Sequence, residues 1–118
     1  MAVAHHSNYL AWFEVGRTDL CREAGISYQE IERQGYLLVV TDASCRYRLP
    51  FQYDEEVVVE TSIVEMSSRS ILFRYLLRGP EETTARASGE TRHLWLDKTT
   101  RRPVRAPESI AALFRPFV

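Results

Sequence analysis

Apolar residues at helical spacing mark the beginning of the chain. They recur at intervals of four, three, four and four residues: Tyr9, Phe13, Gly16, Leu20 and Ala24. This spacing draws one apolar stripe along a helix. Ser7 and Asn8 are good N-cap residues and Gly25 is a good stop, so the sequence predicts a helix between them. Gly16 costs about 1 kcal/mol relative to alanine, which indicates that the helix approaches a neighbour closely there.

The rest of the chain changes to a two-residue period after Gly35. Ser27 and Glu30 fit a capping box, which predicts a short second helix over 27–34. Alternating apolar and polar residues then predict four strands, and a short helix ends the chain. The strands are expected over 43–49, 56–65, 69–78 and 83–97, and the last helix over 108–114. Gly89, inside the last strand, marks a bulge or a point of close packing.

Each strand has one apolar face. The inward positions expected in the first three strands are Ala43, Cys45, Tyr47 and Leu49, then Val57, Val59, Thr61 and Ile63, then Ile71, Phe73, Tyr75 and Leu77. Helices followed by strands favour an α+β fold with an antiparallel sheet. The long helix must bury its stripe, and the apolar face of the sheet is the available surface. We therefore expect a curved antiparallel sheet wrapped around a long helix, in one domain over 1–118.

Composition narrows the possible functions. The chain has 118 residues, of which 45% are hydrophobic and 26% charged, with a net charge of −1. This balance disfavours general nucleic-acid binding, which needs a basic surface. No apolar run approaches the roughly 20 residues of a membrane helix, and the first residues lack the pattern of a signal peptide. Cys21 and Cys45 have no metal-binding spacing, so free thiols and a cytoplasmic protein are the simplest interpretation.

The beginning of the chain resembles a known family. The segments His5–Leu10 and Phe13–Arg17 are similar to the helix entry and first helix of 4-hydroxybenzoyl-CoA thioesterase-like hotdog proteins. Weaker similarities follow in order along the chain: Arg46–Pro50 with Tyr53–Glu55, Arg69–Ser70, Gly89–Thr91 with His93 and Asp97, and Arg102–Val104. The resemblance implies a hotdog fold and an acyl-CoA thioesterase that releases a carboxylic acid and free coenzyme A.

The family pattern also places a catalytic aspartate outside this sequence. The pattern runs Asp-x-x-Gly-x-Val-x-His-x-Asn-Tyr, and its Asn-Tyr aligns with Asn8 and Tyr9. The aspartate then falls two places before Met1, and the family's first strand precedes it. Our hypothesis is that translation was assigned to an internal methionine, or that the chain was cut there. Sequencing the upstream reading frame tests this hypothesis.

Two residues are candidate catalytic groups. By resemblance, the backbone N–H of His6 polarises the thioester carbonyl, at a helix end where free N–H groups and the helix dipole favour an oxyanion. The side chain of His6 need not react, and a structural polar role is the alternative. Glu14 lies at the edge of the apolar stripe. An ion pair with Arg17 is the role we favour for it, and contact with the catalytic water is the alternative.

The substrate-binding candidates lie in two places. Near the helix entry they are His5, Asn8 and Tyr9: Asn8 is expected to cap the helix, and Tyr9 to line the core or the pocket. Arg69 and Ser70 match the family's basic-serine pair, which can receive the phosphates of coenzyme A, although a solvated turn explains Arg69 equally well. Adjacent histidines do not converge easily on a metal ion, so we expect no metal and no cofactor other than the coenzyme A of the substrate.

The sequence leaves three functions to distinguish. The first is hydrolysis of a short-chain or aromatic acyl-CoA. The second is noncatalytic binding of an acyl thioester by this 118-residue chain, in which the family aspartate is missing. A hotdog hydratase ranks last, because its Asp-x-Asn-x-x-His type of signature is absent from the sequence. By resemblance we also expect a homodimer or homotetramer, while the composition predicts no nucleic acid partner and no membrane span. An acyl-carrier-protein thioester stays open as a substrate.

Overall fold

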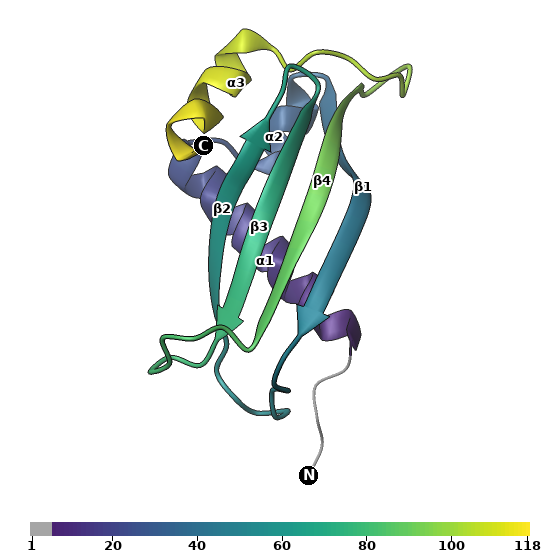
Figure 1. The fold of residues 1–118 in the computed structure, drawn as a ribbon. Coiled ribbons are helices and arrows are strands. Elements are labelled where there is room, and N and C mark those ends of the chain that lie inside the picture. Colours follow the sequence, from purple (N-terminus) through teal and green to yellow (C-terminus); the bar gives the residue numbers. More distant parts are fainter. Residues whose placement is uncertain (1–5) are drawn as a thin grey trace.

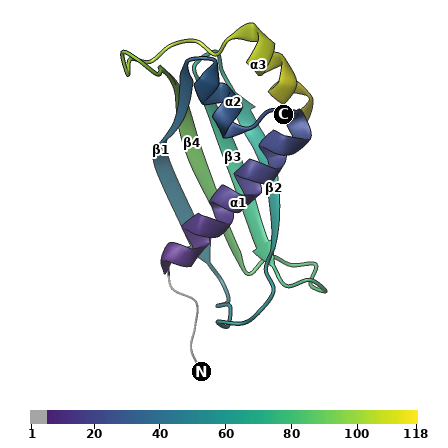
Figure 2. The same ribbon diagram turned by 180° about the vertical axis from the view of Figure 1, so that it is seen from behind.

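The computed structural model describes the backbone from residue 6 to residue 118 and the side chains from residue 8 onward. Its elements are α1 (His6–Ala24), α2 (Tyr28–Arg33), β1 (Tyr36–Tyr47), β2 (Val58–Met66), β3 (Ser70–Arg78), β4 (Ala87–Asp97), α3 (Glu108–Phe114) and the 3-10 turn η1 (Arg115–Phe117). The four strands form one antiparallel sheet in the order β1-β4-β3-β2. The long helix α1 crosses one face of this sheet diagonally, and α2 and α3 lie toward one end of it (Figures 1 and 2).

The contact between α1 and the sheet forms the core. The four inward residues of β3 are fully buried, as the alternating pattern predicts: Ile71, Phe73, Tyr75 and Leu77. Phe13 of α1 is also fully buried, and its ring stacks on Tyr75 with centroids 4.5 Å apart. Large apolar side chains on both surfaces therefore supply most of the burial that holds the helix to the sheet.

Two glycines let the layers approach closely. A Cβ atom on Gly16 would lie 2.8 Å from Val59 Cγ1 on β2. A Cβ atom on Gly89 would meet the ring of Phe13 and lie 2.6 Å from the carbonyl oxygen of Ser44. Both distances are shorter than an ordinary contact between such atoms, so any side chain at these two positions would force the layers apart. The close approach predicted at both glycines is confirmed.

The element boundaries follow the sequence well where local signals are sharp. The last helix occupies Glu108–Phe114 as predicted, and in α2 the Ser27 hydroxyl accepts the Glu30 N–H at 3.1 Å. The first strand is longer than predicted and starts at Tyr36. Its first five residues, Tyr36 to Val40, form a continuous apolar run that shows no alternation. The predicted start of the last strand at residue 83 is also wrong, because β4 begins at Ala87 after a loop.

The end of β1 is more exposed than its alternation suggests. Ala43, Cys45 and Tyr47 pair with inward-facing residues of β4, so they share the inner face as predicted. Ala43 and Tyr47 are nevertheless exposed, and Cys45 is half-buried. Since β1 is an edge strand and only the first turns of the diagonal helix α1 lie near its end, the helix covers this strand only in part.

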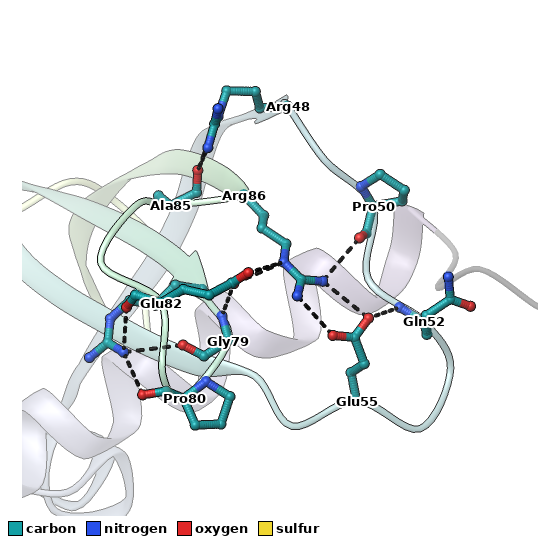
Figure 3. A network of polar contacts seen from close by, with 10 residues as sticks. Arg48, Pro50, Gln52, Glu55, Gly79, Pro80, Glu82, Ala85 and Arg86 are labelled. Atoms are coloured by element: carbon teal, nitrogen blue, oxygen red, sulfur yellow. Dashed lines mark hydrogen bonds and ion pairs between the residues drawn. The ribbon is translucent and has the colours of Figure 1, made fainter.

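A polar clamp joins two loops at the other end of the sheet (Figure 3). The Arg86 guanidinium binds the carboxylates of Glu55 and Glu82, each at 2.9 Å, and donates to the carbonyl oxygen of Pro50 at 3.2 Å. It also lies 4.7 Å from the centre of the Phe51 ring. The clamp therefore fixes Phe51, which is completely buried, between the loops and the core.

Candidate active site

Aromatic side chains fix the first turns of α1 over the end of β1. Tyr9 is buried, and its ring lies edge-on to Tyr47 at 4.6 Å and to Trp12 at 5.0 Å between centroids. Phe51 completes the cluster, 5.6 Å from Trp12. Such edge-to-face pairs add to the stabilisation that comes from burial. The helix entry is thus held in a defined place at one end of the sheet.

Arg17 lies on the buried face of α1, where a charged residue is unusual. Only 9% of its surface is exposed. Its Nε donates to the Tyr28 hydroxyl of α2 at 3.3 Å, and its Nη1 donates to the Tyr75 hydroxyl of β3 at 3.2 Å. The ion pairs found among residues 8–118 do not include Arg17. A buried guanidinium therefore joins three elements through neutral hydroxyl groups.

A chain of hydrogen bonds continues from Arg17 into β4. The Tyr75 and Thr91 hydroxyls are 2.6 Å apart, and Thr91 Oγ1 lies 2.9 Å from His93 Nε2. Burial raises the pKa of Tyr75, so its phenol keeps the proton. Burial and then the nearby Arg17 charge lower the pKa of His93 to about 3, so the imidazole is neutral at pH 7. All three side chains are buried.

The direction of these bonds can be worked out from the donors. Arg17 can only donate, so Tyr75 accepts from it and satisfies its own proton by donating to Thr91. Thr91 Oγ1 can then either donate to His93 Nε2 or accept from an Nε2–H, depending on the tautomer of the ring. Nδ1 has no partner among the described residues. The chain therefore ends in a buried ring nitrogen that no described protein group satisfies.

Two cavities lie along α1 and β1, and both are lined by Glu14, Arg17 and Val40. One measures about 340 Å³ and the other about 320 Å³. The first extends to His93 and α2, and its further lining residues are Tyr28, Ile31, Glu32, Leu37, Leu38 and Val39. The second extends toward the helix entry and is lined by Leu10, Ala11, Ala43 and Thr91 as well. We call these two cavities together the α1–β1 cleft.

The beginning of α1 lies at the end of the cleft that Leu10 lines. The first N–H groups of a helix have no intrahelical acceptor, and the helix dipole adds a partial positive charge there. These groups suit an oxygen that becomes negative during a reaction. The cleft therefore combines a potential oxyanion site at one end with a buried cation further along the helix.

Comparison with known proteins identifies the family. A sequence profile of the Thioesterase-like superfamily matches residues 1–114. The chain belongs to this superfamily. It is similar to YneP of Bacillus subtilis, with 33% identity over 105 residues that cover 88% of this chain and 75% of YneP. It is 26% identical to the acyl-CoA thioester hydrolase YbgC of Escherichia coli over 113 residues, which cover 96% of this chain and 84% of YbgC.

Solved structures of the superfamily superpose closely. The hypothetical protein TT1821 of Thermus thermophilus has a TM-score of 0.92 at 35% identity, over 100% of this chain and 88% of that protein. The DHNA-CoA thioesterase of Staphylococcus aureus has a TM-score of 0.90 at 28% identity, over 98% of this chain and 79% of the enzyme. The predicted α+β hotdog fold and the predicted family are thus confirmed. Within the described chain, no helix has the length and apolar character needed to cross a membrane.

The predicted catalytic residues fall at two places on α1. His6 is the first residue of the helix, and His5 lies outside the described residues. Glu14 is exposed and lines both cavities of the cleft. The favoured ion pair between Glu14 and Arg17 is wrong, because Arg17 turns into the core and binds the two phenols instead. Glu14 is therefore left facing the cleft.

The predicted binding residues are only partly brought together. Asn8 is half-buried and is the third residue of α1, so its predicted role as N-cap is wrong. Tyr9 is a core residue, one of the two predicted alternatives. Arg69 and Ser70 lie at the start of β3. Ser70 pairs with Leu94, close to the end of β4 that is opposite to Ala87. In a single chain they are therefore at the opposite end of the sheet from the first turn of α1.

The buried polar chain is the part of the site that sequence reasoning missed. The sequence predicts an ion pair of Arg17 with Glu14 and indicates no role for His93. The sequence nevertheless contains a signal. Thr91 and His93 lie at two-residue intervals between Gly89 and Trp95, so all four point to the same face of the strand, which is the inner face. Polar residues on a buried face need partners, and Arg17 on the helix stripe is the residue opposite them. Among residues 8–118, no group of three or more potential metal ligands was found.

Proposed function

We propose that this chain is a thioesterase that hydrolyses acyl-CoA to a carboxylic acid and free coenzyme A, with the acyl group bound in the α1–β1 cleft. The observation that carries this proposal is the superposition on the DHNA-CoA thioesterase of S. aureus over 98% of the chain. The identity to the acyl-CoA thioester hydrolase of E. coli supports the same reaction. A short-chain or aromatic acyl group is the substrate that the resemblance implies.

The geometry supports a division of roles along α1. The thioester carbonyl would lie at the first turn, where the backbone N–H of His6 stabilises the oxyanion. Losing one such donor typically costs about 100- to 1000-fold in rate. The acyl group would extend past Leu10 and Ala11 into the cavity of about 320 Å³. Catalysis would then depend on backbone groups at one end of the cleft, and selectivity on side chains further along it.

A carboxylate must activate water or attack the thioester. Glu14 is the carboxylate of α1 that lines both cavities, and the absence of an ion pair with Arg17 leaves it available. The alternative is the family aspartate, which aligns before position 1. We assign Glu14 as the candidate base of this chain. As part of the same proposal, the protein acts in the cytoplasm as a homodimer or homotetramer. That it needs no metal or cofactor stays a prediction.

The test is release of free thiol from a panel of short-chain, aromatic and medium-chain acyl-CoAs. The 118-residue chain, its Glu14→Gln variant and a form extended through the upstream reading frame are assayed together. Turnover by the 118-residue chain that Glu14→Gln abolishes supports Glu14 as the base. Turnover by the extended form alone supports the upstream aspartate. If no form shows turnover but coenzyme A binds measurably, the protein is a noncatalytic acyl-thioester binding protein and the proposed enzymatic function is wrong.

A further inference from the structure

The polar clamp around Arg86 is a connected network rather than a set of separate ion pairs (Figure 3). Glu55, which binds the guanidinium, also accepts the backbone N–H of Gln52 at 2.8 Å. Glu82, the other carboxylate partner, accepts the backbone N–H of Gly79 at 2.6 Å. The side chain of Arg86 is only 17% exposed. Charge-assisted bonds that share one guanidinium in this way specify geometry as well as energy, so the clamp holds two loops in one arrangement.

The backbone of Arg86 is anchored as well as its side chain. Its N–H donates to the carbonyl oxygen of Leu77, near the end of β3, at 2.8 Å. Its own carbonyl oxygen accepts the N–H groups of Arg48 and Leu49, just after β1, at 2.8 and 3.0 Å. Because both ends of the residue are bonded, the guanidinium has a fixed position relative to the sheet.

One aromatic ring connects the clamp to the long helix. The guanidinium carbon of Arg86 lies 4.7 Å from the centre of the Phe51 ring, within the range of a cation–π contact. The same ring lies 5.6 Å from Trp12 and 6.3 Å from Tyr9 between centroids, and both of these residues belong to α1. Phe51 is completely buried. A displacement of this ring would therefore be transmitted directly to α1.

The two helix residues that contact Phe51 lie in the first turns of α1. Tyr9 and Trp12 follow His6 by three and six residues, which is within two helical turns. Hydrogen bonds inside a helix maintain its own geometry, but its place on a sheet depends on side-chain packing. The free N–H groups at the helix entry therefore take their position from this aromatic cluster.

A small change in that position would have a large effect on a reaction. A misplacement of about 1 Å in a catalytic group can cost about 100-fold in rate. An apolar residue at position 86 could still cover part of the Phe51 ring. It could not bind Glu55 and Glu82 together, which needs the planar fork of donors that a guanidinium provides. The clamp thus supplies a precision that packing alone would not.

We propose that Arg86 is a positioning residue, which holds the first turn of α1 in its catalytic place through the rings of Phe51, Trp12 and Tyr9. Arg86 does not touch the substrate. The inference rests on the proposed thioesterase function, in which the N–H groups of this turn stabilise the oxyanion. Since these groups act mainly in the transition state, Arg86 controls the rate of hydrolysis more than the binding of the acyl-CoA.

The first test separates the rate of hydrolysis from substrate binding. Thiol release is measured in the form of the chain that turns over. Arg86→Met should lower kcat by about 10- to 100-fold and change KM little. Arg86→Lys should restore only part of the rate, because one ammonium cannot bridge both carboxylates and cover the ring. The matched control is Arg74→Met, which removes an ion pair with Glu90 at 2.7 Å on the outer face of the sheet and should leave kcat unchanged.

A double variant tests the route through Phe51. Phe51→Leu keeps the position apolar but removes the ring. If Arg86 acts through that ring, adding Arg86→Met to Phe51→Leu should lower kcat much less than the same change does in the wild type. Full effects of both substitutions in the double variant would overturn the proposal. A rise in KM with an unchanged kcat in Arg86→Met would also overturn it.

A spectroscopic measurement follows the helix entry without any substrate. The chain has two tryptophans, so labelling with 5-fluorotryptophan gives two fluorine resonances, which Trp12→Phe assigns. Arg86→Met should shift or broaden the Trp12 resonance. The Trp95 resonance should stay unchanged, because Trp95 lies eight residues along β4 from Ala87, about 26 Å in a strand. An unchanged Trp12 resonance, or equal changes at both tryptophans, would contradict a specific link from Arg86 to the helix entry.

Two further results remain decisive. If Arg86→Met does not fold, Arg86→Lys provides both measurements, with smaller changes expected in the same direction and none expected if the proposal is wrong. Failure of every form to hydrolyse any acyl-CoA would refute the proposed thioesterase function. The Trp12 resonance would in that case still support or refute the control of the helix entry by Arg86.

Discussion

Acidification should destabilise the protein through His93 before most carboxylates titrate. The imidazole is 1% exposed and lies edge-on to the Phe73 ring at 5.2 Å. Burial, and then the Arg17 cation, lower its pKa in the folded state to about 3. An unfolded histidine has a pKa of about 6.5. Below this value the unfolded chain binds a proton that the folded chain does not bind. The contribution of His93 to folding stability is therefore complete above pH 6.5 and is lost progressively down to about pH 3.

The size of the effect follows from these two pKa values. Each pH unit below 6.5 removes about 1.4 kcal/mol, which gives a loss of about 2 kcal/mol between pH 7.5 and pH 5. Urea unfolding, followed by the fluorescence of Trp12 and Trp95, measures this loss. His93→Gln keeps a polar side chain that can bond to Thr91 but cannot titrate. The difference in unfolding free energy between the wild type and this variant should therefore shift by about 2 kcal/mol over the same range.

This comparison also separates His93 from the other titrating groups. The carboxylates of the Arg86 clamp lose their stabilising charge at lower pH, in both proteins alike, and cancel in the difference. A difference between wild type and His93→Gln that stays constant from pH 7.5 to pH 5 would refute the reasoning. It would mean that the ring gains a proton in the folded state without penalty, and that the site is open to water.

Three further changes test the packing and the polar contacts. Gly89→Ala should lower the unfolding free energy by about 1–3 kcal/mol in urea titrations, because the new methyl group meets Phe13; an unchanged midpoint would contradict the close approach. Arg86→Met should lower the melting temperature at pH 7. The Arg86 contact lowers the pKa of Glu55, so wild-type stability should fall as the pH drops through the range of that carboxyl, and the variant should show a smaller fall. Tyr75→Phe removes two buried hydrogen bonds and should lower the unfolding free energy by about 1–3 kcal/mol in the same urea assay; an unchanged unfolding free energy would mean that the hydroxyl faces water.

Much of the fold could be predicted because local signals agree with the tertiary structure. In β3 the residues Ile71, Phe73, Tyr75 and Leu77 alternate with residues that face away from α1, and all four are fully buried. The Ser27 cap fixes the start of α2 in the same way. The first strand shows the limit of this reasoning. Tyr36 to Val40 carry no alternation, so neither a strand nor a helix could be assigned to them from periodicity.

The site was less predictable because its contacts are distant in sequence. Arg17 and Tyr75 are separated by 58 residues and meet only when the helix crosses the sheet. The helical spacing of Arg17 from Glu14 suggested a local ion pair, and tertiary packing overrode it. Periodicity gives the face of a residue but not its partner. The predicted positions of Arg69 and Ser70 came from the resemblance, and nothing in one chain brings them to the cleft.

The polar chain under α1 shows why a buried charge must be judged together with its partners. Replacing a buried charge and its partners together by apolar residues is often neutral or favourable, whereas removing one partner alone leaves the others unsatisfied. The guanidinium also joins α1 to α2 and to β3 through Tyr28 and Tyr75. Replacing Arg17 alone would therefore leave the Tyr28 and Tyr75 hydroxyls without its donors and weaken the link among the three elements.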